Sequence, residues 1–123
     1  MAYYHANSQG NNARTVYVNY VDGGGDNFMG NNSGVSSTTD HGTGDFTVNF
    51  ALNFSNTHYL FTQGCSSENT NGNRGANGCN IKDNSLKVVG SCRVASYYGS
   101  TGSGDGAQTS CKTTTMVFTG DIA

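Results

Sequence analysis

The histidines and possible nucleophiles of this chain form no recognisable catalytic or metal-binding motif. His5, His41 and His58 are far apart and lack the HExxH or HxH spacing of metal sites. A nucleophile needs a base held beside it, yet no GxSxG, P-loop or GxGxxG motif is present. The sequence therefore predicts a protein that is not an enzyme and that uses neither a cofactor nor a metal.

The aspartates could bind calcium, but their positions favour a structural role. Asp22, Asp26, Asp40, Asp45 and Asp105 each lie within two residues of a glycine. An aspartate placed in this way commonly caps its own turn by accepting backbone N–H groups. Residues 23–26, GGGD, resemble part of a calcium-binding repeat, but the motif does not recur. We therefore interpret these five residues as turn caps.

Four cysteines bracket two long polar loops and offer three kinds of chemistry. Pairing nearest neighbours, Cys65 with Cys79 and Cys92 with Cys111, would close each loop at its base. Each bridge would add roughly 3 kcal/mol on the chain-entropy model. Zinc binding lacks the usual CxxC spacing, and free buried thiols are the third reading. The sequence favours disulfides, which imply an oxidising final location.

The two loops, residues 64–80 and 99–110, have the composition of a binding surface. They are rich in Asn, Ser, Thr and Gly, whose amides and hydroxyls match the hydroxyls of neutral sugars, and aromatic faces stack on pyranose rings. The alternative is that both are solvated connectors. Glu68 and Asp105 are the only carboxylate pair that a polysaccharide hydrolase could use. The candidate ligand-binding residues are Asn69, Asn71, Asn73, Arg74, Asn77, Tyr97, Tyr98 and Asp105.

The elements that must position these loops are strands, because apolar residues recur at every second position. In residues 46–54, Phe46, Val48, Phe50, Leu52 and Phe54 alternate with small or polar residues, which predicts one apolar face at the centre of the core. Residues 35–39 and 59–62 are expected to flank this strand. Further strands are predicted at 14–20, at 87–98 with a bulge at Gly90, and at 112–119.

These strands predict an all-β fold, an antiparallel β-sandwich-like domain with long Gly- and Asn-rich loops. Residues 1–13 are expected to form an N-terminal arm, and residues 14–123 a single β domain. The formal net charge is −2 and the six basic residues are scattered, which argues against nucleic-acid binding. No apolar run approaches the roughly 18 residues of a membrane helix, so membrane insertion is not expected.

The segment SSTTDHGTGDFTVNFALNFSNTHYLFT, Ser36 to Thr62, resembles the distal domains of bacteriophage tail fibres, in which a stretch of the form SSITDNGTGDYTVNF occurs. RTVYVNYVDGGG, Arg14 to Gly25, is similar to the first strand of that family. The resemblance covers residues 14–62. Beyond residue 62 only the composition and the plan of long loops are similar.

The resemblance implies a homotrimeric β domain at the tip of a virion fibre. Such a domain binds a glycan or protein on the host surface, and the N-terminal arm would contact other virion proteins. The expected location is the virion, made in the host cytoplasm and extracellular after release. The alternative is a purely structural role, as a capsid or tube decoration protein or a filament subunit.

Overall fold

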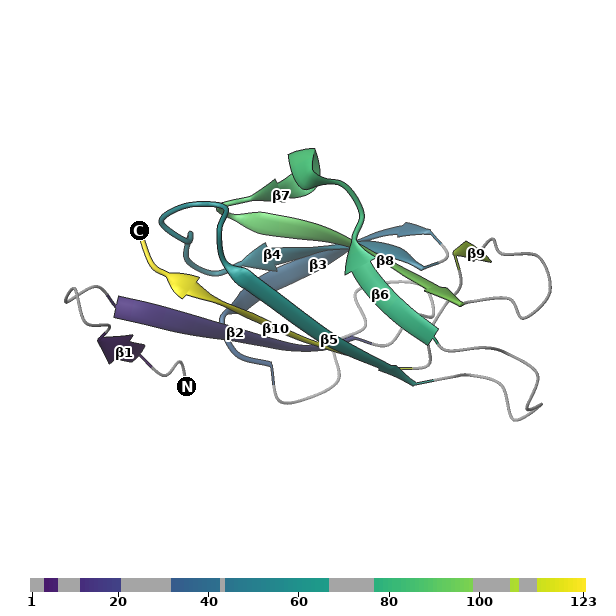
Figure 1. Ribbon diagram of the computed structural model, residues 1–123, viewed down its shortest axis with the longest axis horizontal. Helices are drawn as coiled ribbons and strands as arrows, with labels where there is room; N and C mark the ends of the chain where they lie inside the picture. Colours follow the sequence, from purple (N-terminus) through teal and green to yellow (C-terminus); the bar gives the residue numbers. More distant parts are fainter. Residues whose placement is uncertain are drawn as a thin grey trace.

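The computed structural model describes residues 4–6, 12–20, 32–42, 44–66, 77–98, 107–108 and 113–123. These residues form two antiparallel β-sheets packed face to face (Figure 1), which confirms the predicted all-β, sandwich-like fold. Sheet A has the order β1 (Tyr4–Ala6), β2 (Asn12–Tyr20), β10 (Thr113–Asp121), β5 (Leu60–Ser66). Sheet B has the order β3 (Val35–Gly42), β4 (Asp45–Phe50), β8 (Ser91–Tyr98), β6 (Asn77–Ile81). Two short strands, β7 (Lys87–Val88) and β9 (Ala107–Gln108), also pair with β8, and a 3₁₀ turn, η1 (Asn84–Leu86), precedes β7.

The core lies between the sheets and follows the alternation of the strands. Sheet A contributes inward residues from β2 and β10, and sheet B contributes them from β4, β8 and β6. Phe54 and Tyr59, from the segment that joins β4 to β5, complete the core. The buried hydrophobic residues are Val16, Val18, Phe46, Val48, Phe50, Phe54, Tyr59, Cys79, Cys92, Val94, Met116 and Phe118.

The strand predicted over residues 46–54 is shorter in the structure. β4 ends at Phe50, and Leu52 is 51% exposed rather than part of the apolar face. The backbone N–H of Ala51 still donates to the carbonyl of Gly34 at 2.9 Å, and beyond it the carbonyl of Leu52 accepts from Arg14. Phe54 returns to the core through an isolated bridge with Ile122.

Arg14 holds this segment in place from the interior. It is only 2% exposed, and its guanidinium donates to the carbonyls of Leu52 and Gly34, both at 2.9 Å. Gly34 has a φ of +77°, and a Cβ there would lie 2.5 Å from Arg14 Nη2. The buried Arg14 guanidinium therefore supplies hydrogen bonds to the carbonyls of Leu52 and Gly34, where the chain leaves sheet B.

Two other predicted features differ in the structure. Of residues 59–62, expected beside β4, residues 60–62 belong to β5 in the opposite sheet, where they pair with β10. β8 takes the place beside β4. The segment after β4 carries the chain across the sandwich, and local alternation cannot reveal that crossing. Gly90 is not a bulge, because it lies in the turn of a hairpin formed by β7 and β8.

The predicted disulfides are not present at the two cysteines whose side chains are described. Cys79 and Cys92 are free, fully buried thiols. Cys79 lies opposite Ser96 in the register, four residues along β8 from Cys92. That offset is about 13 Å at the usual strand rise, too far for a bridge. Of their predicted partners, Cys65 is described only as backbone in β5, and Cys111 lies outside the described residues.

The start of the chain contributes to sheet A. Within the segment expected to be an arm, residues 4–6 form β1 and pair with the beginning of β2, so that Tyr4 lies opposite Arg14. The other predicted strands have neighbours as follows: β2 pairs with β10 along its length, and β3 pairs with β4. The expected strands at 14–20, 35–39 and 112–119 are confirmed.

Candidate functional site

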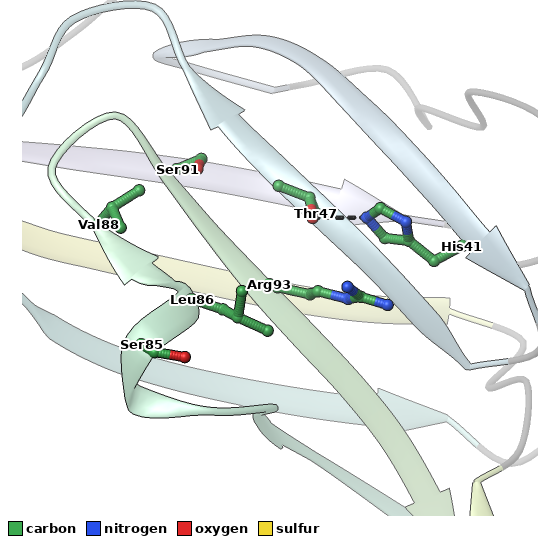
Figure 2. Close-up of a pocket in the computed structure, with 7 residues that line it drawn as sticks. All are labelled: His41, Thr47, Ser85, Leu86, Val88, Ser91 and Arg93. Atoms are coloured by element: carbon green, nitrogen blue, oxygen red, sulfur yellow. Dashed lines mark hydrogen bonds between the residues drawn. The ribbon is translucent and has the colours of Figure 1, made fainter.

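A pocket of about 260 Å³ lies on the outer face of sheet B, away from the core (Figure 2). Its walls come from β3, β4 and β8 on one side and from η1 and β7 on the other. Five lining side chains carry polar groups and two are aliphatic. The lining residues are His41, Thr47, Ser85, Leu86, Val88, Ser91 and Arg93.

The floor of the pocket is a consequence of strand alternation. Phe46 and Val48 point into the core, so Thr47 between them points outward. Cys92 and Val94 are buried in the same way, which turns Ser91 and Arg93 outward. Thr47 lies directly opposite Arg93 in the register of β4 and β8. These groups are therefore held on the most central strands of sheet B.

The cover of the pocket is a short turn fixed by its own cap. The Asp83 carboxylate accepts hydrogen bonds from the backbone N–H and the hydroxyl of Ser85, each at 2.7 Å. The N–H of Leu86 donates to the carbonyl of Asp83 at 3.0 Å. This cap forms η1 and brings Ser85 and Leu86 to the pocket.

A tyrosine from the core fixes the hairpin that carries Val88 and Ser91. The hydroxyl of Tyr59 lies 3.1 Å from the carbonyl oxygen of Val88 and 3.2 Å from that of Ser91, and donates to them. The ammonium group of Lys87 lies 4.6 Å from the centre of the Tyr59 ring, a cation–π contact. The wall formed by β7 is therefore anchored to the centre of the sandwich.

Burial favours the uncharged forms of Tyr59 and Cys92, which lie in the core behind β7 and β8. It raises the pKa of Tyr59 well above its usual range, and it raises the pKa of the Cys92 thiol to about 11. Only a thiolate is strongly nucleophilic, so Cys92 acts as a core residue at neutral pH.

An ion-pair cluster borders the pocket at Asp45. Its carboxylate accepts from Arg93 Nε at 2.8 Å and from Arg93 Nη2 at 2.9 Å, and it also pairs with Lys82 Nζ. Hydrogen bonding from Arg93 lowers the pKa of Asp45 to about 2. The interpretation of Asp45 as a turn cap is therefore wrong. For Asp40 it is confirmed, because its carboxylate accepts from the N–H of Gly42 at 2.8 Å.

Acid should weaken the fold as Asp45 takes up a proton. The folded-state pKa of Asp45 is lowered from 3.8 to about 2, so its contribution is complete above about pH 4 and is lost as the pH falls toward 2. The melting temperatures of the wild type and Asp45→Asn, measured from pH 6 to pH 2, should differ most at pH 6 and converge at pH 2. A difference that does not change with pH would contradict this assignment.

The pocket can hold a small polar ligand through several kinds of contact. His41 Nε2 and Thr47 Oγ1 are hydrogen bonded at 2.8 Å, and both side chains face the pocket. The hydroxyl of Ser91 can donate or accept, the hydroxyl of Ser85 already donates to Asp83 and can accept, and Arg93 can only donate. Leu86 is 36% exposed and Val88 is 42% exposed, which leaves apolar surface beside these polar groups.

Most of the predicted ligand-binding residues are not among those described. Tyr97 is described, and its hydroxyl accepts a hydrogen bond from Asn80 Nδ2 at 3.1 Å. Asn77 and Tyr98 lie opposite each other in β6 and β8, with only their backbone described. The remaining predicted residues lie outside the described residues: Asn69, Asn71, Asn73, Arg74 and Asp105, together with Glu68 of the alternative hydrolase pair.

The pocket does not follow from the composition of the loops, although part of its signal is present in the strands. Ser91 and Arg93 are the outward residues of a strand whose inward residues were recognisable, and Thr47 has the same position in β4. Ser85, Leu86 and Val88 do not follow from the sequence pattern. A single strand over 87–98 with a bulge at Gly90 would carry them away from Ser91 and Arg93, whereas the turn at Gly90 brings them back. The pocket exists only because β7 folds back on β8.

The described residues contain no group of three His, Cys, Asp or Glu side chains that could hold a metal ion. Within the same residues, no helix is long and apolar enough to span a membrane. Comparison of the chain with models of protein families, with curated proteins and with solved structures finds no match.

Proposed function

We propose that this chain is a non-enzymatic binding domain of a bacteriophage tail fibre or fibre tip, and that it attaches the virion to a glycan or protein on the host surface. The observation that supports this proposal best is the pocket on the outer face of sheet B. The resemblance to tail-fibre domains includes residues 36–62, and this segment supplies β3 and β4, from which His41 and Thr47 line the pocket.

The pocket has the chemistry expected of a carbohydrate site. Ligand pockets combine apolar surface with a few placed polar groups. Here the exposed parts of Leu86 and Val88 can cover the C–H face of a sugar ring, while Ser85, Ser91 and Thr47 offer hydroxyls to its own hydroxyl groups. A volume of about 260 Å³ is below the range of drug-sized sites and suits one sugar ring.

The proposed assembly is a homotrimer located in the virion. A chain with 34% hydrophobic residues gains stability when further surface is buried between subunits. Contacts with other virion proteins would come from residues 1–13, in which β1 forms the edge strand of sheet A. Three copies would present three pockets to a repetitive surface, and the linked sites would bind more tightly than one alone.

Filling the pocket should abolish attachment. Val88→Trp places a large ring at an exposed lining position, whereas Leu60→Trp does the same at a residue that is 63% exposed on β5 in the opposite sheet. Each protein is first shown by native mass spectrometry to have about three times the mass of the 12.9 kDa chain. Its retention is then measured on a panel of intact bacteria and immobilised lipopolysaccharide, capsular polysaccharide and teichoic acid.

The wild type and Leu60→Trp should be retained equally on at least one surface, and Val88→Trp at least tenfold less. Equal retention of all three proteins would place attachment outside this pocket. If the wild type is retained on no surface and forms an open-ended polymer, the chain has the structural role of a decoration protein or filament subunit instead.

A further inference from the structure

Arg93 presents unused hydrogen-bonding capacity to the pocket. Asp45 occupies Nε and one hydrogen-bonding direction of Nη2. Nη1 has no hydrogen-bond partner among the described residues, and the Arg93 side chain is 28% exposed. Figure 2 shows the guanidinium reaching toward the side of the pocket where His41 lies. A ligand in the pocket can therefore accept from Arg93 while the pair with Asp45 stays intact.

The ion-pair cluster that holds Arg93 has a net positive charge. Asp45 contributes one negative charge, and its partners Arg93 and Lys82 contribute two positive charges, so the cluster carries a net charge of about +1 at neutral pH. None of the seven lining residues is acidic. Asp83, beside the pocket residue Ser85, keeps its negative charge, but its carboxylate is directed at the N–H and hydroxyl of that serine and does not line the pocket. A partly buried guanidinium in this setting favours an anion over a neutral group.

The remaining groups select the kind of anion. Because the Ser85 hydroxyl donates to Asp83 at 2.7 Å, its oxygen faces a ligand mainly as an acceptor for hydroxyl groups. Leu86 and Val88 add apolar surface that a bare phosphate would leave uncovered. On this geometry, and resting on the proposed function, we infer that the pocket binds an acidic sugar of the uronic acid type, with its carboxylate on Arg93 and its ring against Leu86 and Val88.

The inference is tested with sugars that differ only in the anionic group. Chemical-shift titrations of the native protein would use methyl glucuronide against methyl glucoside and methyl galacturonide against methyl galactoside, with inorganic phosphate as an anion without a ring. At least one uronide should bind ten times or more tighter than its neutral partner, and phosphate should bind more weakly than that uronide.

Two sets of variants separate the pocket charge from the fold. Arg93→Gln should remove the preference for the uronide, whereas Lys82→Gln, which takes one positive charge from the same Asp45 cluster but does not line the pocket, should change it less than threefold. Since Arg93→Gln can also weaken folding, Val88→Asp and its uncharged match Val88→Asn are measured as well. Val88→Asp should lose uronide binding tenfold or more relative to Val88→Asn, with equal melting temperatures.

Three results would overturn the inference in different ways. If uronides and neutral glycosides bind equally, the carboxylate assignment is wrong and a neutral-sugar site remains. If phosphate binds as tightly as the uronide and competes with it, the pocket recognises the anion alone. If no sugar binds in the titrations although the wild type is retained on bacterial surfaces, attachment uses another site. If the protein neither binds a sugar nor is retained on any surface, the proposed function is wrong as well.

Discussion

Replacing Phe50 with alanine should lower the free energy of unfolding by about 3–5 kcal/mol. Phe50 is 6% exposed, and its ring meets those of Phe54, Phe118 and Tyr59 edge to face at centroid distances of 5.0, 5.1 and 5.5 Å. The substitution removes contacts with Phe118 of sheet A and with Phe54 and Tyr59 of the segment that joins the two sheets, and the cavity cannot collapse without moving a sheet. Urea denaturation followed by fluorescence or circular dichroism measures the loss.

Leu52→Ala is the matched control for this prediction. The alternation of residues 46–54 assigns Leu52 and Phe50 to the same apolar face, but the structure leaves Leu52 51% exposed. Its replacement should change stability by no more than about 0.5 kcal/mol. Equal losses at the two positions would show that the strand continues beyond Phe50, contrary to the structure.

Gly120→Ala should also destabilise the protein, by about 1–3 kcal/mol, through overpacking. A Cβ at Gly120 would lie 2.7 Å from Cβ and 3.1 Å from Cα of Tyr59, and 3.2 Å from Cδ1 of Phe54. The backbone of Tyr59 would have to move, and with it the hydroxyl that contacts the hairpin of Val88 and Ser91. We therefore expect a lower melting temperature together with weaker ligand binding.

Gly64→Ala provides the comparison for Gly120. Gly64 lies on β5, and a Cβ there would meet nothing within 4 Å. Alanine restricts the unfolded chain more than glycine does, so this change should be neutral or slightly stabilising. A loss of stability as large as that of Gly120→Ala would indicate a general intolerance of sheet A to side chains and not a specific clash with Tyr59.

The sequence was sufficient to predict the strands and their faces, because these depend on neighbouring residues. The inward positions Val16, Val18, Phe46 and Val48 follow from a period of two and are buried as expected. The end of β4 was not predictable in this way. Just beyond this end, the carbonyl of Leu52 accepts from Arg14, a residue 38 positions away in sequence.

The candidate site was not predictable because its contacts are distant in sequence. Asp45 and Arg93 are 48 residues apart, and they meet only because β4 pairs with β8 in one particular register. The prediction that residues 59–62 flank residues 46–54 supplied the wrong neighbour for that strand. Polar composition favours the loops, whereas Thr47 and Arg93 of the pocket are single polar positions between apolar ones.

The alternation that builds the pocket places pocket residues and core residues at different positions of the same strands. A substitution can therefore change the pocket without changing the core. Thr47 and Ser91 have core residues as their neighbours along the strand, yet their own side chains leave the core untouched. On the proposed function, substitutions at these outward positions can alter ligand preference at little cost to folding. Arg93 is the exception, because its exchange also strips Asp45 of a partner. On that proposal, such a domain can diversify its recognition around a constant guanidinium while its interior stays the same.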